Sequence, residues 1–424
     1  MKRLPRLAAA FALVAAAPAL AAPNPDTTVG QIVASPSYRA AVAAFDSDHD
    51  QWVEDIVAIT QIAAPPFKEE ARAKAFAEML RKRGLDPKID EEGNVLALRK
   101  GTQPGPVVVV AAHLDTVFPE GTDVTVRREG TKLMAPGVGD DSAGLATLLA
   151  LIDAMNAGKV QTRSDILFVG DVGEEGLGDL RGVRHLFTKG EYKGRIGAFF
   201  SLDGGGLDSM TTGGTGSKRY RVTFKGPGGH SYGAFGIVNP MAALAQTVTG
   251  LYKLKVPSEP KTTYSASVVG GGTSVNAIPA EVWLEVDMRS ASAAELAKLE
   301  TQFLAIVPKA VAAENAARST KPGKISAELK PIGDRPAGHT DPNADIVRFA
   351  EAAFHSEGIN VKKGTSSTDS NIPMSLGIPA ITMGHIAEGG RAHSPDEWID
   401  TAKAPNLKLK RILLATILAA AGMP

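Results

Sequence analysis

Histidine and acidic residues recur at the ends of apolar segments in this chain. His113 closes one apolar run, Asp203 follows a second, and Glu174 and Glu175 stand shortly after a third. In open α/β sheets, ligands bind at the carboxyl ends of the strands. If these runs are strands, their polar residues share one edge of a sheet, and the spacing predicts a functional site there.

The segment from Gly137 to Gly144 adds two neighbouring carboxylates, Asp140 and Asp141, in a glycine-rich turn before a helix-like stretch. Such turns can also bind phosphate through the N–H groups of a helix start. Two acids at that position would repel phosphate, whereas carboxylate oxygens suit a cation. The turn therefore favours a metal ion.

Three of the eight histidines have polar, glycine-flanked or strand-end surroundings: His113, His230 and His393. Imidazole and carboxylate together suit zinc. His385, which follows an apolar segment at 378–383, is the alternative to His393 as a late metal ligand. A single acidic pair is more often a solvated loop, but several such sites on one α/β pattern indicate a metal centre.

Adjacent carboxylates can divide the work at such a centre. Glu175 can ligate a metal while Glu174 takes a proton from metal-activated water. Asp115 lies two residues after His113, on the same face of a strand. We expect its carboxylate to orient the imidazole and so select the nitrogen that meets the metal.

The elements that must position these residues follow two patterns. Buried apolar strands alternate with helices up to Gly213, which is typical of an α/β sheet. The order then becomes strand, helix, strand, strand, helix, strand, the ferredoxin-like arrangement. We expect an α/β domain in two parts, residues 22–213 and 328–424, and an inserted domain at residues 214–327. A chain of 424 residues suits two cores, because single cores stop growing at roughly 250–300 residues.

Composition excludes several classes of function. The 46 basic residues equal the 46 acidic ones, so nothing indicates a nucleic-acid partner. The chain has no cysteine, which excludes disulfide bonds and thiol catalysis.

The first residues have the pattern of a secretory signal peptide, predicted at residues 1–21. A basic start precedes an apolar run from Leu7 to Leu20, and small residues surround Ala21. The run is shorter than the roughly 20 residues that a membrane-spanning helix needs, which disfavours a stable membrane anchor. We expect cleavage near Ala21 and a periplasmic or secreted protein.

Together the motifs resemble one family of enzymes. The resemblance rests on His113-x-Asp115, Gly139-Asp140-Asp141, Glu174-Glu175, Leu202-Asp203-Gly204 and the late His393. This order is similar to that of the co-catalytic zinc peptidases of the peptidase T, glutamate carboxypeptidase and succinyl-diaminopimelate desuccinylase group. The resemblance implies an α/β zinc-exopeptidase-like catalytic domain, with a mostly parallel mixed sheet flanked by helices. It also implies a ferredoxin-like α+β insert that serves as lid and dimerisation domain.

The resemblance implies a metal-binding role for each residue of the motifs. Two Zn²⁺ ions, with Co²⁺ or Mn²⁺ as substitutes, would be bridged by Asp140. One ion would be completed by His113 and Asp203, and the other by Glu175 and His393. Glu174 would be the general base.

In the insert, the resemblance implies that His230 contacts the developing oxyanion, often across a homodimer. It also implies that Asn276 and Arg289 contact the substrate. The alternative for Arg289 is an ordinary strand-end ion pair with Asp287 or Glu285. Elsewhere the chain departs from the family, because Ser142 stands where many relatives carry lysine.

The implied reaction is hydrolysis of amide bonds in short peptides or N-acyl amino acids. Asp203, where other branches of the group use Glu, favours an aminopeptidase acting on di- or tripeptides. A glutamate-type carboxypeptidase or an N-acyl amino acid deacylase remains open. A catalytically silent peptide-binding relative is disfavoured because Glu174 is intact. We also expect the insert to close over the metals, with hinges near Gly213–Gly216 and Lys321–Lys324.

Overall fold

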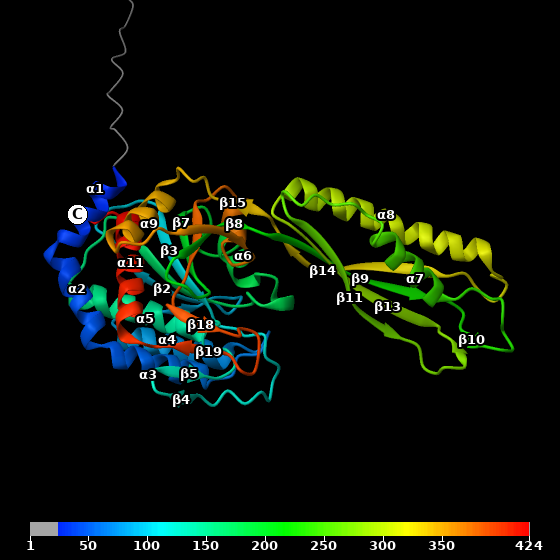
Figure 1. Cartoon of the computed structure of the whole chain (residues 1–424). Coiled ribbons are helices and arrows are strands. Elements are labelled where there is room, and N and C mark those ends of the chain that lie inside the picture. Colours follow the sequence, from blue (N-terminus) through cyan, green and yellow to red (C-terminus); the bar gives the residue numbers. More distant parts are fainter. Residues whose placement is uncertain (1–23, 424) are drawn as a thin grey trace, which may run out of the picture.

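The computed structural model describes residues 24–423 of the chain. The predicted signal peptide lies outside the described residues. Within the described part, no helix is both long enough and apolar enough to cross a membrane. Two bodies lie side by side, a larger one that holds both ends of the described chain and an elongated one built from its middle (Figure 1).

A nine-stranded mixed sheet forms the centre of the larger body. The strand order is β1-β2-β6-β3-β7-β17-β8-β15, and β16 pairs with β8. The central run β6-β3-β7-β17 is parallel, and antiparallel pairings flank it on both sides. The bounds are β1 (Lys88–Ile89), β2 (Val95–Arg99), β3 (Val107–His113), β6 (Ile166–Asp171), β7 (Ile196–Leu202), β8 (Ser209–Gly214), β15 (Gly338–His339), β16 (Lys362–Ser366) and β17 (Ala380–Met383).

Helices cover both faces of this sheet, which explains why its central strands are apolar throughout. In β3, Val108 and Val110 pack into the core on one face, while Val107 and Val109 pack into the core on the other. Successive side chains of a strand point to opposite faces, so a strand buried on both faces needs apolar residues at every position.

The first face carries α1 (Pro25–Ala34), α2 (Pro36–Ser47), α3 (His49–Thr60), α4 (Glu70–Lys82), α5 (Ser142–Ala157), α9 (Asp345–Ser356) and α11 (Lys403–Ala421). The second face carries α6 (Arg181–Thr188) and α10 (Asn371–Ser375). Helix α5 packs between β3 and the pair α2 and α3. Most residues of α5 are buried. The helix is therefore held firmly in the core, and so is the turn before it, which contains Asp140.

A small antiparallel sheet at the edge of the larger body joins two distant parts of the sequence. Its order is β18-β19-β5-β4. The strands are β4 (Arg127–Glu129), β5 (Lys132–Met134), β18 (Glu388–Gly390) and β19 (Trp398–Asp400). Because β19 pairs with β5, the loop that carries His393 lies next to the turn that carries Asp140.

The elongated body is the predicted ferredoxin-like insert. Its four-stranded antiparallel sheet has the order β11-β13-β9-β14. Two helices cover one face, and the buried face includes Tyr220, Val222 and Phe224 at alternate positions of β9. The elements are β9 (Gly216–Lys225), α7 (Pro240–Leu251), β11 (Thr262–Gly271), β13 (Glu281–Ser290), α8 (Ala293–Ala317) and β14 (Ser326–Arg335), with a two-stranded pair of β10 (Gly229–His230) and β12 (Ala277–Ile278).

The chain passes between the two bodies twice. The first crossing lies between the end of β8 at Gly214 and the start of β9 at Gly216. The second lies after Arg335, because β14 runs past the predicted boundary at residue 327 and stays paired with β9 up to Arg335. A register shift between Pro331 and Gly333 breaks the alternation of this strand, which hides its second half from pattern analysis.

The second predicted hinge, Lys321–Lys324, is therefore wrong. This segment precedes β14, whose first residue, Ser326, pairs with Lys225 at the end of β9 remote from the first crossing. Lys321–Lys324 thus lies at the far end of the insert. The second place where the chain could bend between the bodies is after Arg335.

Candidate metal centre

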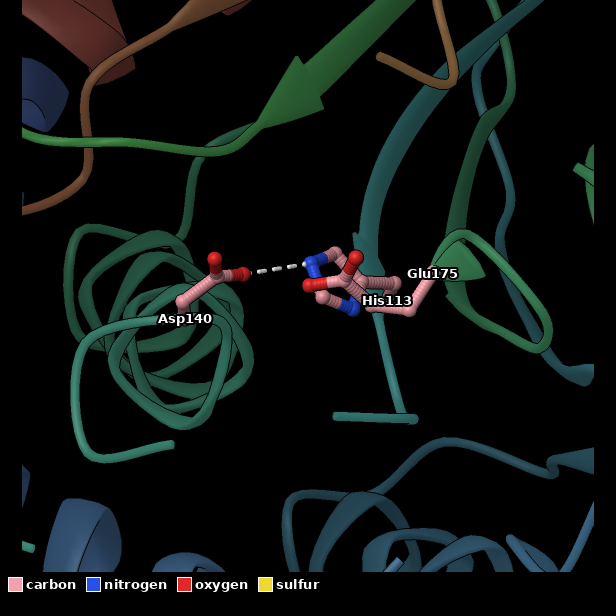
Figure 2. A group of neighbouring side chains, drawn as sticks. All are labelled: His113, Asp140 and Glu175. Carbon is pink, nitrogen blue, oxygen red and sulfur yellow. Dashed lines mark hydrogen bonds and ion pairs between the residues drawn. The ribbon is translucent and has the colours of Figure 1, made fainter. Parts of the chain in front are cut away.

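Three predicted ligands converge at the carboxyl end of β3. Ligand atoms of His113, Asp140 and Glu175 lie within 4.8 Å of one another. Figure 2 shows these side chains pointing toward one another from β3, from the turn before α5 and from the loop after β6. The Nδ1 atom of His113 faces the backbone carbonyl of Asp115 at 3.0 Å. A carbonyl only accepts, so Nδ1 carries the proton and Nε2 is left to face a metal.

The two carboxylate oxygens of Asp140 point to two different histidines. Oδ1 lies 2.9 Å from Nε2 of His113, and Oδ2 lies 3.0 Å from Nε2 of His393. The same nitrogen of His393 is 2.9 Å from Oε1 of Glu175. One carboxylate between two nitrogen donors is the arrangement that a pair of metal ions with a shared anionic ligand requires. The donors present therefore fit two zinc ions.

The charges at the centre also favour cations. Hydrogen bonds to Asp140 and Glu175 raise the pKa of His393 to about 10. Burial raises the pKa of Asp203 to about 6, with help from the charges of Asp140 and Glu175. Closely spaced carboxylates thus either hold protons or attract positive partners, and a divalent cation would replace those protons.

The position of His393 carries backbone strain. Its φ is 65°, and a left-handed conformation costs a non-glycine residue about 1–2 kcal/mol. Hydrogen bonds from Ser394 N to the carbonyl of Arg391 and from Glu397 N to the carbonyl of Ser394, both 3.1 Å, close the turn around it. Strain of this kind clusters at functional sites.

Asp115 has a different role from the one expected. Its carboxylate lies 3.7 Å from Nδ1 of His113, and its backbone carbonyl orients the imidazole instead. The carboxylate accepts the backbone N–H groups of Gly173, Glu174 and Glu175 at 2.9, 3.1 and 2.9 Å. Asp115 therefore holds the loop that presents Glu174 and Glu175.

Glu397 holds the opposite loop in the same way. Its buried carboxylate accepts the backbone N–H groups of Gly137, Gly139 and Asp140 at 3.0, 2.7 and 2.8 Å. Burial raises the pKa of Glu397 to about 7, although these N–H groups favour the charged form. No local pattern in the sequence indicated this role for Glu397, because the residue lies far from Asp140 along the chain.

The two candidate late histidines have separate places. His393 reaches Asp140 and Glu175, whereas His385 is buried behind the turn. His385 donates from Nε2 to the carbonyl of Gly139 at 2.9 Å, and its Nδ1 lies 3.4 Å from Asp141. Burial lowers the pKa of His385 to about 4. The structure therefore gives His393 the position of a ligand and His385 that of a neutral support.

A cavity of about 580 Å³ opens onto the centre. Asp140, Glu174, Glu175, Asp203, Arg289 and His393 all contribute to its wall. Burial raises the pKa of Glu174 well above its usual range, while the charge of Arg335 opposes that shift. Arg335 donates from Nη1 to Oε1 of Glu174 at 3.0 Å and from Nη2 to the Glu174 carbonyl.

Sequence reasoning missed Arg335. The residue stands alone before Pro336 at the end of β14, and no motif surrounds it. It becomes recognisable only once the fold brings the second crossing of the chain against Glu174.

His230 and Asn276 lie away from the metal ligands. They line a separate hollow of about 770 Å³ in the insert, near β10, at the end of the elongated body remote from the larger one (Figure 1). Arg289 does line the metal cavity, and its Nε is also 2.7 Å from Oδ2 of Asp287. Both readings of Arg289 are therefore compatible with its geometry.

Comparison with known proteins agrees with this architecture. The model of the peptidase family M20/M25/M40 matches residues 109–418, most of the chain. The chain belongs to this family. The family resemblance drawn from the motifs is thus confirmed, and the protein is a metal-dependent peptidase or related hydrolase.

One curated relative, from Pyrococcus abyssi, is provisionally named a LysW-lysine/LysW-ornithine hydrolase. It is 32% identical over 137 residues, which are 32% of this chain and 36% of the relative. The match therefore spans about a third of that protein.

Solved structures share the fold over nearly the whole chain. A tripeptidase from Staphylococcus aureus has a TM-score of 0.70 at 20% identity, over 88% of this chain and 98% of that one. YXEP of Bacillus subtilis, described as a dinuclear metal-binding peptidase of the M20 family, has a TM-score of 0.64 at 17% identity, over 89% and 99%. At such identities the likeness shows the fold alone.

Proposed function

We propose that this M20-family protein is a di-zinc exopeptidase that hydrolyses amide bonds of short peptides, acting as an aminopeptidase on di- or tripeptides. The proposal rests on the position of Asp140. Its two carboxylate oxygens face the histidines His113 and His393, and the same residue lines one cavity with Glu174. His113, Asp140, Glu175, Asp203 and His393 would hold the ions. Bound zinc would polarise the scissile carbonyl and lower the pKa of water.

Glu174 is the proposed general base. Its carboxylate lies in the cavity wall, next to Glu175 in sequence and held by Arg335. Burial raises its pKa, which suits a carboxylate that must accept a proton and then return it near neutral pH. It would take a proton from water and give it to the leaving amine.

Arg289, a proposed substrate-binding residue, has a place in the same wall. Guanidinium groups bind carboxylates through paired hydrogen bonds, so this residue suits the terminal carboxylate of a short peptide. The same feature would serve a carboxypeptidase or an N-acyl amino acid deacylase, which are the alternatives to an aminopeptidase.

His230 and Asn276 require a second copy of the chain in this proposal. They share one hollow of the insert remote from the metal ligands of their own chain. A homodimer formed through the insert would let the partner's insert supply them. Removal of residues 1–21 during export is a separate proposal, tested by the N-terminal sequence of the protein recovered from the periplasm.

The test is hydrolysis of a small panel by zinc-loaded protein, with a chelator control. The panel contains free di- and tripeptides, N-blocked peptides and N-acyl amino acids. Chelator-sensitive cleavage that needs a free amino end supports the aminopeptidase. Cleavage of blocked substrates overturns it in favour of a carboxypeptidase or deacylase. Absence of all cleavage by fully metal-loaded protein supports a silent binding relative.

A further inference from the structure

Several hydrogen bonds from the insert meet one short segment of the larger body. This segment, residues 174–184, begins with the proposed general base Glu174 and ends inside α6. Arg219 donates to the carbonyl of Gly176 at 2.9 Å, and Arg335 donates to both the side chain and the carbonyl of Glu174. The position of the insert and the position of Glu174 are therefore linked.

A further contact with this segment binds the backbone of Asp334. Oδ1 of Asp179 accepts the backbone N–H of Asp334 at 2.9 Å, and Nη2 of Arg184 donates to the Asp334 carbonyl at 2.7 Å. The same Nη2 lies 3.3 Å from Oδ2 of Asp179, so the two side chains also contact each other. Together, Asp179 and Arg184 form a latch on Asp334.

The latch takes the place of a neighbouring strand. β14 stands at the end of the strand order β11-β13-β9-β14 and pairs with β9. The outer edge of such a strand leaves N–H and C=O groups without strand partners, and in an antiparallel strand both groups of one residue point to the same side. The latch satisfies both groups of Asp334, so it fixes this edge of β14 against the larger body.

The backbone that presents the latch is strained. Asp179 and Leu180 have φ values of 55° and 59°, a left-handed conformation that residues other than glycine rarely adopt. Leu180 is fully buried in the core on the second face of the sheet, and its N–H donates to the carbonyl of Gly173 at 2.8 Å. Such strain persists where the surroundings determine it, and it clusters at functional sites. Here the strained turn directs the carboxylate of Asp179 toward β14.

The latch fixes the residue that precedes Arg335, and Pro336 fixes the other side. A proline restricts the residue before it to extended conformations, and the carbonyl of Pro336 accepts a hydrogen bond from Asn371 at 2.9 Å. The side chain of Arg335 is buried and also donates to Oγ of Ser367 at 3.2 Å. A long side chain loses conformational freedom when it is held in one place. A backbone fixed on both sides of Arg335 preorganises its contact with Glu174.

We propose that Asp179 and Arg184 are positioning residues, whose hold on Asp334 seats Arg335 against Glu174 and so couples the position of the insert to that of the general base. A general base acts only within hydrogen-bond reach of the proton that it takes. A small displacement of Glu174 therefore lowers the rate of the chemical step while substrate binding is unchanged. This inference rests on the proposed function for the role of Glu174, and it adds two residues remote from the substrate.

The first arm measures kcat and KM of the zinc-loaded protein for the peptide that it cleaves fastest. Asp179→Gly removes the acceptor, and glycine adopts the left-handed backbone freely, so added strain does not confound the result. We expect kcat to fall ~3–10-fold, the size of one lost hydrogen bond, with KM and zinc content near those of the parent. Asp179→Asn keeps an acceptor oxygen and tolerates this backbone, so it should retain most of kcat. An unchanged kcat in Asp179→Gly, or a change in KM alone, overturns the proposal.

Lys218→Gln is the matched control. Nζ of Lys218 binds Oδ2 of the Asp334 side chain at 2.8 Å, so this change removes a contact of the same residue but neither of its backbone bonds to the latch. We expect kcat to stay near the parent value. A fall equal to that of Asp179→Gly would show that any loosening of Asp334 has the same effect, and it would contradict a special role for the latch.

A double-mutant cycle tests whether the latch acts through Arg335. Arg184→Gln alone should lower kcat by ~3–10-fold, again the size of one hydrogen bond. In an Arg335→Gln background the same change should have little further effect, because the residue that the latch positions is gone. Effects that multiply in the double variant would show an independent structural role and would overturn the proposal.

Hydrogen exchange followed by mass spectrometry tests the latch without turnover. In zinc-loaded Arg184→Gln, the amides of residues 172–180 and of residues 333–337 should both exchange faster than in the parent, whereas Lys218→Gln should change neither. Faster exchange at 333–337 alone, or at neither segment, counts against the coupling. If no peptide is cleaved but both segments respond, the proposed reaction is wrong and the link between Asp334 and the Glu174 loop stands. The unfolding midpoint of each variant, measured in parallel, identifies any that lose activity through misfolding.

Discussion

The loops that carry the proposed metal ligands and the inserted domain are held in place by different means. Two of the loops that carry proposed ligands are each fixed from behind by a buried carboxylate that accepts three backbone N–H groups: Asp115 for Glu174 and Glu175, and Glu397 for Asp140. The insert meets the larger body through two chain crossings and a few polar contacts, among them those of Arg219 and Arg335.

The proposed metal ligands and the residues proposed to contact the substrate thus lie on parts of the molecule with different supports. Metal ligands must be held within a fraction of an ångström, so their supports are buried and preorganised. The residues proposed to contact the substrate, His230, Asn276 and Arg289, lie on the insert, which has fewer ties; this would suit the proposed closure of the insert over bound substrate. Four predictions test this contrast, from the largest expected effect to the smallest.

Replacement of the shared carboxylate should have the largest effect. In Asp140→Ala both histidines lose their common partner, so we expect low zinc content at both positions and loss of turnover. Elemental analysis after dialysis measures the metal. Asp208→Asn, which alters a surface pair with Lys362, is the control. Two zinc ions retained in Asp140→Ala would contradict the bridging role.

Glu174→Gln should retain metal but lose turnover. The amide keeps the shape of the side chain but cannot accept a proton from water, so kcat should fall by ~10²–10⁴-fold. Zinc content near that of the parent separates this effect from ligand loss. Unchanged kcat would remove Glu174 from the mechanism.

Asp115→Asn tests whether the loops really need their buried supports. An amide offers one oxygen in place of two and turns an N–H₂ group toward backbone donors, so the loop should loosen. We expect zinc affinity ~10–100-fold weaker, as for other residues that support metal ligands. Titration against a competing chelator measures it. An affinity equal to the parent's would show that the loop holds its shape without Asp115.

The smallest expected effect is on how the stability of the metal-free protein depends on pH. The pKa of His393 is raised to about 10 by Asp140 and Glu175, so the stability from its charged form is full below about pH 6.5, the unfolded value. It is lost as pH rises toward 10. Raised carboxyl pKa values, such as that of Asp203 at about 6, act in the same direction at lower pH.

The unfolding midpoint of the metal-free protein should therefore fall as pH rises from 6.5 to 10, and His393→Gln should flatten that slope. Zinc should reverse it, because metal binding displaces these protons. A midpoint independent of pH in this range would argue against close contact between His393 and the two carboxylates.

The sequence predicted the alternation of buried strands and helices, because the spacing of apolar residues reflects which faces of each element are buried. It indicated the α/β body, the ferredoxin-like insert and the first crossing near Gly214. The sequence prediction placed the second crossing too early, near Lys321–Lys324, because Pro331 and the adjacent register shift interrupt the alternating pattern of β14. A local pattern cannot show a strand that continues through an irregularity.

Sequence by itself determined the residue types of the metal centre and their order along the chain, since ligand chemistry depends on side-chain identity and strand ends are marked by local pattern. Only the tertiary structure placed His393, rather than His385, beside Asp140 and Glu175. It also directed the Asp115 carboxylate to the loop behind the imidazole and separated His230 and Asn276 from the cavity. It also brought Arg219 and Arg335 into the cavity wall. Each of these depends on contacts between segments distant in sequence, which no local pattern records.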